Sequence, residues 1–368
     1  MLPILKVSAR KKLRDFSIDV DISIEGNIAV MLGPSGHGKT MMLNMIAGIT
    51  RPDEGKISIG NTLFFDSSKG ICVRMEKRNI GFVFQDYALF PHVSVFENVA
   101  YGLKARGLPA AEIQLRVMRE MERLAISNLQ NELPARLSAG QRQRVALARA
   151  LVIDPCLLLM DEPLSALDMQ LRSRVRSELK ELLRQLEIPT IIVTHDVLDA
   201  IGLGGTVMVL EHGRIAQQGT YEDLLAAPAS RFVAEFVESN AYTGNVKSVD
   251  SHGDATIVLE KGVEITTILE EEHSDTILVV IHPWDVSLQK NSEEGSVRNI
   301  LKGKVLSISP LRDRVRVTVD AGIRITAEIT RPSLEKLQIK EGDEVYAGFK
   351  TISVRVFPLE NRKRWRGN

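Results

Sequence analysis

The sequence has few cysteines, few aromatic residues and no excess of charge of either sign. Among its 368 residues are two cysteines and 5% aromatic residues, and 47 basic residues balance 47 acidic ones. Cys72 and Cys156 form no CxxC pair, so we expect neither a disulfide framework nor a cysteine-based zinc site, and a reducing compartment fits. Because the net charge is zero, no global basic field is present and no nucleic-acid partner is expected.

Long apolar runs are also missing. No stretch approaches the roughly 18–20 apolar residues that a membrane-spanning helix needs. The N-terminal charges follow a very short apolar piece, which is the wrong order for a secretory signal. The chain is 44% hydrophobic and 26% charged, a mixture typical of globular proteins with a large core. Its length predicts two or three domains.

Two different sequence patterns divide the chain. Over residues 1–235, short apolar runs alternate with amphipathic stretches, which predicts an α/β architecture. Residues between about 91 and 154 have the pattern of a helical insert, whereas residues 236–368 alternate Val, Ile and Thr with polar residues and predict a small all-β domain. The predicted strands of the first region are residues 28–32, 80–84, 156–160, 190–194 and 206–210.

A glycine-rich segment fits the GxxxxGK[ST] pattern of a phosphate-binding loop. It follows a predicted strand and opens a predicted helix, which is the context that the motif requires. Glycines let the backbone direct N–H groups at phosphate oxygens, next to the positive end of the helix dipole. Lys39 is expected to reach the β- and γ-phosphates of ATP, and Thr40 to ligate Mg²⁺. His37 occupies a variable position of the pattern and is expected to be exposed and not catalytic. The predicted ATP-binding loop consists of Gly33, Pro34, Ser35, Gly36, His37, Gly38, Lys39 and Thr40.

Two acidic residues end another predicted strand. Asp161 and Glu162 follow CLLLM, and ligands of open α/β sheets bind at the carboxyl ends of the strands. Asp161 is expected to help hold Mg²⁺, and Glu162 to polarise an attacking water. By themselves the two residues fit an ordinary acidic turn equally well, but the phosphate loop upstream favours the catalytic interpretation.

Four further motifs resemble those of ATP-binding-cassette (ABC) transporter ATPases. LSAGQ at residues 137–141 is similar to the family's signature, with Ala139 at a position where the family usually has glycine. Gln85 resembles the Q-loop glutamine, residues 165–168 (SALD) resemble the D-loop, and His195 resembles the switch histidine. The motifs follow the family's order over about residues 1–225. The resemblance implies a RecA-like P-loop ATPase core with a helical subdomain.

The same resemblance implies a head-to-tail homodimer with ATP and Mg²⁺ at a shared seam. Glu162, His195 and Lys39 would be the catalytic residues, and Gln85 would contact the nucleotide and Mg²⁺. The residues that would reach ATP in trans are Ser138, Ala139, Gly140, Gln141 and Asp168.

The sequence departs from the family's pattern at two places. Phe16, the first aromatic residue, is expected on a strand, so no residue is assigned to stack on adenine. Residues 202–205 (GLGG) occupy a stretch where the family commonly has an acidic–basic pair.

An ATPase of this kind without its own pore implies separate permease subunits. The chain would lie at the cytoplasmic face of the cell membrane, and a periplasmic or extracellular solute-binding protein would be an indirect partner. Residues 86–106 are expected to accept a permease helix, although core packing explains each single aromatic equally well. The aromatic residues of this stretch include Tyr87, Phe90, Phe96 and Tyr101.

The β-rich region resembles the accessory domain of importer ATPases, with an OB-like TOBE or Mop-type segment at about 293–358. SVRN at residues 296–299 is similar to the Ser-Ala-Arg-Asn element of molybdate-binding Mop-type domains. This resemblance implies an importer of molybdate or tungstate, with the same oxyanion as a possible regulatory ligand. Importers of sulfate, iron, polyamines or sugars remain alternatives, as does a cytosolic oxyanion-binding protein. The expected oxyanion ligands are Ser296, Arg298, Asn299 and Lys302.

Overall fold

The computed structural model describes residues 4–14, 16–251, 253–269, 276–291, 297–311 and 314–358. It divides into two compact units, Met1–Glu222 and Asp223–Asn368. The boundary lies before the expected position 235, because the helices that follow it belong to the second unit. Among the described residues, no helix is long and apolar enough to cross a membrane.

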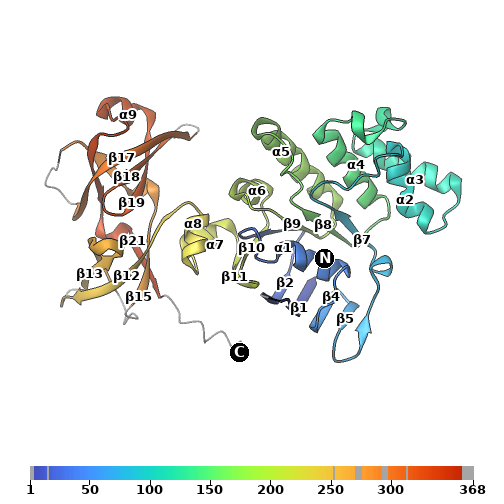
Figure 1. The fold of residues 1–368 in the computed structure, drawn as a ribbon, viewed down its shortest axis with the longest axis horizontal. Helices are drawn as coiled ribbons and strands as arrows, with labels where there is room; N and C mark the ends of the chain where they lie inside the picture. The colour runs from blue at the N-terminus through green and yellow to red at the C-terminus, as the bar shows by residue number, and fades with distance from the viewer. Residues whose placement is uncertain are drawn as a thin grey trace. The chain divides into compact units, whose positions relative to one another are not determined.

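The first unit is built on a six-stranded sheet with the order β11-β10-β3-β9-β8-β7 (Figure 1). β3 (Ile28–Leu32), β8 (Leu157–Asp161) and β9 (Thr190–Val193) are buried at every position, as expected for parallel strands covered on both faces. β7 (Ile80–Val83) and β10 (Thr206–Glu211) flank them, and β11 (Arg214–Gly219) is an antiparallel edge strand. All five predicted strands are present, and their ends differ by at most one residue from the prediction.

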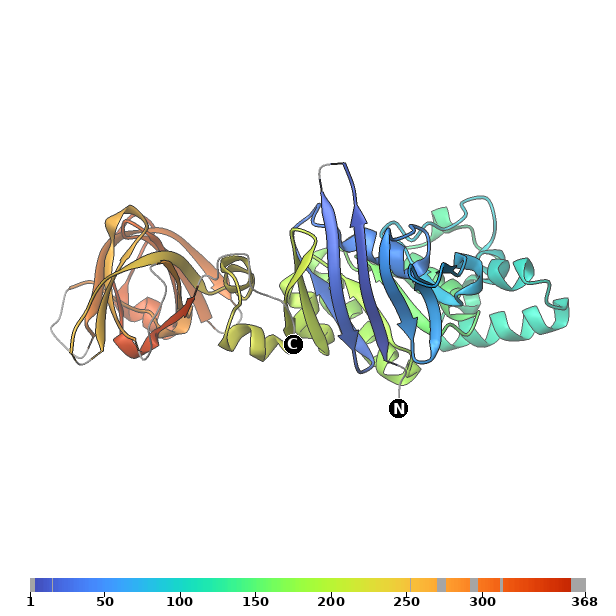
Figure 2. The same ribbon diagram turned by 90° about the horizontal axis from the view of Figure 1, so that it is seen from below.

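An antiparallel sheet forms a second layer, with the order β2-β1-β4-β5-β6. Its strands are β1 (Leu5–Lys12), β2 (Ser17–Ile24), β4 (Glu54–Ile59), β5 (Thr62–Asp66) and β6 (Ile71–Cys72). Helix α1 (Lys39–Ala47) shares one hydrophobic core with strands of both sheets (Figure 2). The helix that follows the phosphate loop is therefore fixed by packing between two layers.

The helices of the first unit cover the other parts of the central sheet. α2 (Val95–Ala105), α3 (Ala110–Arg123) and α4 (Ala139–Leu151) form the helical insert between β7 and β8, and α4 packs against both α2 and β7. α5 (Met169–Leu186) follows β8, and α6 (Val197–Leu203) follows β9 and packs against α5 and β3.

Two short helices precede the strands of the second unit: α7 (Tyr221–Ala226), which spans the boundary between the units, and α8 (Arg231–Phe236). Arg355 of the β region donates a hydrogen bond of 2.9 Å to the carbonyl oxygen of Ala226, and α8 packs against the first strand of that region. These contacts link α8 and the end of α7 to the β region.

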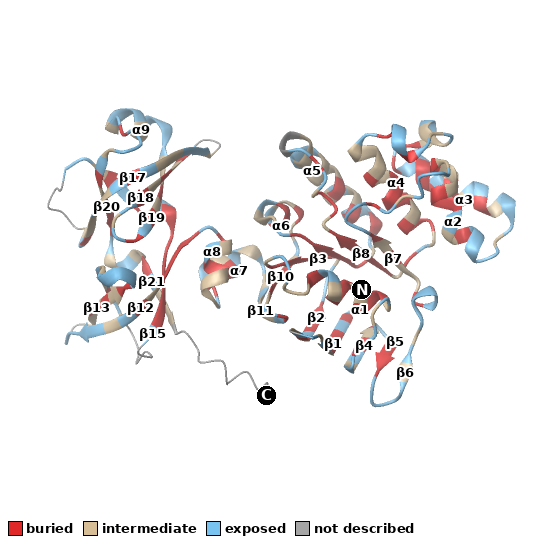
Figure 3. Ribbon diagram, in the orientation of Figure 1, coloured by how far each residue is buried: buried red, intermediate tan, exposed pale blue. Residues whose placement is uncertain are grey.

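Two five-stranded antiparallel sheets share one core in this unit (Figure 3). The first sheet has the order β14-β13-β12-β15-β21, and the second has the order β16-β20-β17-β18-β19. The elements are β12 (Asn240–Val249), β13 (Asp254–Leu259), β14 (Glu264–Ile268), β15 (Thr276–Ile281), β16 (Ser287–Gln289), β17 (Asn299–Leu311), β18 (Arg314–Asp320), β19 (Arg324–Thr330), α9 (Arg331–Leu337), β20 (Glu344–Phe349) and β21 (Val354–Pro358).

The two sheets repeat one plan, a feature that the sequence analysis missed. The pattern N-x3-G-x-V opens both β12 and β17, each of which is followed by a hairpin, and the last strand of each half pairs with the other half's sheet. The Asn240 side chain hydrogen-bonds the backbone of Thr326 at 2.8 and 2.7 Å, and Asn299 bonds Thr266 at the same two distances. Each half of the unit therefore forms hydrogen bonds to the backbone of the other half.

Candidate active site

The phosphate loop lies between β3 and α1, in the predicted context. At Gly33 a Cβ atom would stand 2.2 Å from the carbonyl oxygen of Leu210, so a side chain there would collide with the neighbouring strand. Gly38 precedes α1 with a φ of 102°, a left-handed conformation that favours glycine. The part of the loop that is open to solvent includes Ser35, Gly36 and Thr40.

Lys39 is held inside this loop. Its side chain is buried, and its Nζ donates hydrogen bonds to the carbonyl oxygens of Gly33 at 2.7 Å and Pro34 at 2.9 Å. Burial lowers the pKa of Lys39, although the nearby carboxylates of Glu162 and Asp161 oppose the shift. A phosphate anion at this position would offset the desolvation of the ammonium group.

Asp161, the last residue of β8, is suited to a hard cation. It is 5% exposed, and burial raises its pKa even though a hydrogen bond from the Thr40 hydroxyl acts in the opposite direction. Its Oδ1 atom is buried and has no hydrogen-bond partner among the described residues. A buried carboxylate oxygen without a partner is costly, and Mg²⁺ prefers oxygen ligands. The residues present therefore fit a Mg²⁺ ion that is shared with bound phosphate.

Glu162 meets two residues from neighbouring strand ends. Its Oε1 lies 3.1 Å from Nδ1 of His195, which follows β9, and its Oε2 accepts a hydrogen bond of 3.4 Å from Nε2 of Gln85, which follows β7. Glu162 has a φ of 46°, and its N–H donates to the carbonyl of Val193 at 2.9 Å. This uncommon backbone conformation turns the side chain out of the strand direction.

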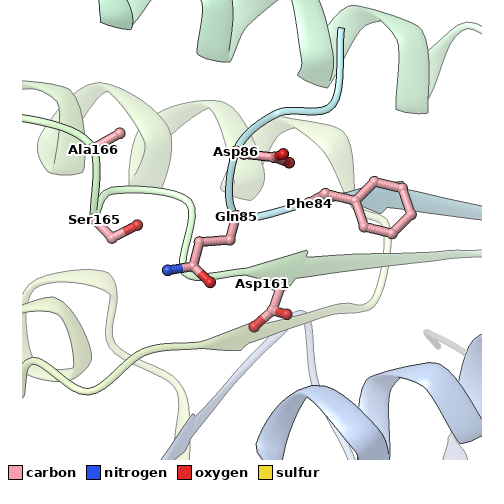
Figure 4. A pocket seen from close by; sticks show the side chains of 6 residues that line it. All are labelled: Phe84, Gln85, Asp86, Asp161, Ser165 and Ala166. Carbon is pink, nitrogen blue, oxygen red and sulfur yellow. The ribbon is translucent and has the colours of Figure 1, made fainter. Parts of the chain in front are cut away.

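A cavity of about 580 Å³ opens beside these residues (Figure 4). Gln85 enters it from the segment after β7, and Asp161 enters it from the end of β8. The structure thus brings four of the predicted residues, Gln85, Asp161, Glu162 and His195, to one edge of the parallel sheet. The residues that line the cavity are Phe84, Gln85, Asp86, Asp161, Ser165 and Ala166.

The signature residues open helix α4. Ser138 caps this helix, its hydroxyl accepts from the N–H of Gln141 at 3.3 Å, and the Gln141 side chain accepts from the N–H of Ser138 at 2.8 Å. Ala139 has a helical conformation, so the replacement of the family's glycine requires no left-handed φ. At Gly140 an added Cβ would meet nothing within 4 Å. Asp168 caps α5, and its Oδ1 accepts a hydrogen bond of 2.9 Å from the N–H of Leu171.

Two aromatic side chains next to the phosphate loop are placed differently from the prediction. Phe16 precedes β2 and does not lie on a strand, and its ring lies against Gly38, where an added Cβ would be 3.1 Å from Cε1. His37, expected to be exposed, is only partly exposed; its Nδ1 accepts from the N–H of His212 at 3.1 Å, and the two rings are 4.6 Å apart. Neither contact has a signal in local spacing, because both join distant segments.

The stretch after Gln85 contains both core and surface aromatics. Tyr87 is buried and donates a hydrogen bond of 3.3 Å to the carbonyl of Pro163, and burial raises the pKa of its hydroxyl. Phe90 and Tyr101 are 38% and 56% exposed, and their rings are 4.6 Å apart. The guanidinium of Arg149 lies 5.4 Å from the centre of the Phe90 ring. Core packing thus explains Tyr87, whereas Phe90 and Tyr101 form an exposed pair.

Three of the four expected oxyanion ligands lie among the described residues, and each of them has its own partner within the unit. Ser296 lies outside the described residues. Arg298 and Lys302 each form an ion pair with a carboxylate, and Asn299 is buried against a backbone segment. Asn299 and Lys302 are three positions apart on β17, so their side chains project from opposite faces of the strand. The partners of Arg298, Asn299 and Lys302 are Asp254, Thr266 and Glu344, respectively.

Comparison with known proteins was made for both regions. The family model described as ABC transporter matches residues 16–165, and the model described as TOBE domain matches residues 295–356. The molybdate/tungstate import ATP-binding protein WtpC of Pyrococcus horikoshii is 39% identical over 348 residues, which cover 94% of this chain and 96% of that protein.

Two further similarities widen the comparison. The spermidine/putrescine import ATP-binding protein PotA of Methylococcus capsulatus is also 39% identical, over 90% of this chain and 85% of that protein. The solved structure of cbiO1 from Clostridium perfringens, part of the ABC transporter complex cbiONQ, matches with a TM-score of 0.54 and 32% identity. That match covers 65% of this chain and 95% of the other.

Proposed function

Because this chain belongs to the ATP-binding subunits of ABC transporters and hydrolyses ATP, we propose that it energises an importer of molybdate or tungstate. The observation that carries the choice of solute is the 39% identity to WtpC, which extends over 94% of this chain and therefore includes the β-rich unit. A polyamine importer is the second candidate, because PotA reaches the same identity over 90% of the chain.

The geometry supports a direct role for Glu162 in hydrolysis. Its carboxylate would accept a hydrogen bond from the attacking water and orient it toward the γ-phosphate. His195, 3.1 Å away and 49% exposed, would steady this carboxylate and face the developing charge. Lys39 and the N–H groups of the phosphate loop would hold the β- and γ-phosphates. Thr40 and Asp161 would hold Mg²⁺ close to Gln85, and this ion supplies charge neutralisation at the phosphate oxygens.

A second copy of the chain would complete the site. The first turn of α4 is exposed at Ser138, and the capping box leaves the N–H groups of Ala139 and Gly140 without an acceptor within the helix. Such a helix end binds phosphate, which supports ATP contacts in trans from residues 138–141. Asp168 would lie at the same seam.

The permease partner would dock beside Phe90 and Tyr101. These rings form an exposed aromatic pair on the helical insert, close in sequence to Gln85, and Arg149 places a cation over one of them. An aromatic surface of this kind suits an apolar helix face. We place the complex at the cytoplasmic side of the cell membrane, where the permease would expose its docking segment to ATP-binding subunits.

The variant Glu162→Gln tests the hydrolytic role. Without the carboxylate the water loses its base, so kcat should fall about 10²–10⁴-fold while ATP still binds. Phosphate release and ATP affinity would be measured together, with Glu25→Gln in an exposed turn as the control. Turnover at the wild-type level in the Glu162 variant would remove this residue from the role.

The identity of the transported solute requires a separate measurement of uptake, with the wild-type subunit and the Glu162→Gln variant. Cells that express the wild-type subunit and its permease should take up labelled molybdate, and cells with the Glu162→Gln subunit should not. Uptake of spermidine or sulfate in place of molybdate would overturn the solute but not the ATPase. A chain that binds oxyanion without any turnover would instead indicate a binding protein.

A further inference from the structure

Behind His195 lies a cluster of charged side chains that the nucleotide site does not include. Arg172 and Arg176 project from α5 onto Asp199 of α6, which is 2% exposed. Arg172 Nη2 lies 2.6 Å from Asp199 Oδ2, and Arg176 Nε lies 3.1 Å from Asp199 Oδ1. Arg176 also donates a hydrogen bond of 2.8 Å to the carbonyl oxygen of Leu198. The two helices are thus joined by nearly buried charges.

The cluster holds both chain neighbours of His195. On one side, the hydroxyl of Thr194 donates to Asp199 Oδ2 at 2.9 Å and accepts from the N–H of Asp196 at 3.1 Å. On the other side, Arg172 Nη1 lies 3.2 Å from Asp196 Oδ2. The backbone that carries His195 is therefore tethered before and after the histidine.

The glycines at residues 202–205 create room for this arrangement. A Cβ atom at Gly202 would lie 2.3 Å from Cδ of Arg176, so any side chain there would displace the arginine. At Gly205 a Cβ would collide with the carbonyl oxygen of Ile28 at 2.1 Å. Two of the glycines in this stretch thus have a physical reason: Gly202 faces Arg176 of α5, and Gly205 lies against the backbone of β3.

The same cluster is linked to the expected dimer seam. The N–H of Arg172 donates to the carbonyl of Asp168 at 2.8 Å, so these residues are one helical turn apart. Burial disfavours the charged form of Arg172, but hydrogen bonding to Asp199 and attraction to Asp199, Asp196 and Glu162 outweigh it and raise the pKa of the guanidinium. Arg172 therefore stays charged within the cluster.

We propose that Arg172 and Arg176 are positioning residues for His195, and that they couple the first turn of α5 to the catalytic pair. Contact of Asp168 with a second copy would shift this turn, and Arg172 would pass the shift to the segment 194–196. The coupling rests on the proposed function, because that function places Asp168 at the seam. The positioning role itself depends only on contacts within one chain.

A set of three variants tests the positioning role: Arg176→Ala, Gly202→Ala and the two combined. Each single change should lower kcat about 10- to 100-fold, because small displacements of a catalytic group are costly. The KM for ATP and the affinity for ADP should stay within about twofold of wild type, because the phosphate loop is untouched. The double variant should match Arg176→Ala alone, because the added methyl no longer meets an arginine.

Two further variants complete the experiment. Arg174→Gln is the matched control, because Arg174 lies on the same helix but is 78% exposed and forms an ion pair with Glu178 along the surface. Arg172→Lys keeps the charge but loses the paired contacts, and its kcat should fall between those of wild type and Arg176→Ala. Melting temperatures are recorded for all chains.

The possible failures can be told apart. If the wild type turns over ATP but Arg176→Ala and Gly202→Ala keep kcat within about twofold, the positioning role is wrong and the ATPase stands. If kcat and nucleotide affinity fall together with the melting temperature, or if the effects of the two changes add, the cluster only supports the fold and the inference is again wrong. If the wild type shows no turnover, the proposed function fails first.

Discussion

Gly140 stands in the first turn of α4, where a side chain would find open space. A glycine is not needed there for the fold of a single chain, because its φ is helical and no neighbour is close. By contrast, Gly33 could not accept a side chain without a clash with the carbonyl oxygen of Leu210 at 2.2 Å. Because the fold of one chain does not require glycine at position 140, we infer that another molecule approaches this residue closely.

We therefore predict opposite effects of Gly140→Ala on folding and on function. Alanine should raise the free energy of unfolding by about 0.5–1 kcal/mol, because it loses less backbone entropy in a helix. If residues 138–141 contact ATP in trans, the methyl group should weaken ATP-dependent dimerisation and lower kcat, each by roughly tenfold. Urea titration measures the first effect, and sedimentation with ATP together with phosphate release measures the second. Unchanged dimerisation in Gly140→Ala would contradict the assignment.

At the scale of elements, the junction between α8 and β12 is joined to the end of β15. Ser239 Oγ and His282 Nδ1 are 2.9 Å apart, and both residues are buried. The ring of Trp284 stacks on His282 with centroids 4.5 Å apart. Burial and the nearby Arg355 lower the pKa of His282, and Asp285 opposes them. The contacts at this junction thus favour the neutral form of His282.

This arrangement predicts a pH-dependent stability of the second unit. Because the folded state lowers the pKa of His282, the unfolded state takes up the proton first as the pH falls. Above the ordinary histidine pKa of about 6.5 the full stability is present, and below it the stability falls by at most about 1.4 kcal/mol per pH unit until the folded pKa is reached.

Urea unfolding between pH 7.5 and pH 5 would measure the effect by Trp284 fluorescence, in a Trp365→Phe background that leaves one tryptophan. His282→Gln should reduce the pH dependence, whereas His92→Gln, at an exposed position, should not. An equal pH dependence with and without His282 would show that another group is responsible.

At the scale of the whole molecule, one unit has the candidate active site at the edge of its parallel sheet. The other unit consists of two halves that follow the same plan. In the second unit, β21 pairs with β15 and β16 pairs with β20, so neither half closes its sheet alone. Asn240 and Asn299 occupy equivalent places in the two halves, and each satisfies one backbone N–H and one carbonyl of the other half.

Replacement of either asparagine should therefore cost the same stability. Asn240→Ala and Asn299→Ala each leave a backbone N–H and a carbonyl without their partner, which should lower the free energy of unfolding by about 2–4 kcal/mol. Asn245→Ala, at an exposed position on β12, should change it by less than about 0.5 kcal/mol. Chemical denaturation measures all three. A large change for only one of the two buried asparagines would show that the halves are not equivalent.

The parts of this protein that depend on neighbours in the chain could be predicted from the sequence by itself. The phosphate loop, the acidic strand end at Asp161 and Glu162, the cap at Ser138 and the five central strands all follow from residue type and local spacing. Backbone geometry and helix dipoles act over a few residues, so a short stretch of sequence contains all the information that such features need.

Only the tertiary structure decided which distant segments meet. Gln85 and Glu162 are 77 positions apart, and His37 and His212 are 175 apart, so no local pattern records these contacts. The contact of Arg176 with Gly202, the paired asparagines, the place of Phe16 and the ion pairs of Arg298 with Asp254 and of Lys302 with Glu344 have the same origin. All these contacts depend on how strands and helices from distant parts of the chain pack together. Close packing selects one arrangement for a whole unit, and no single segment determines it.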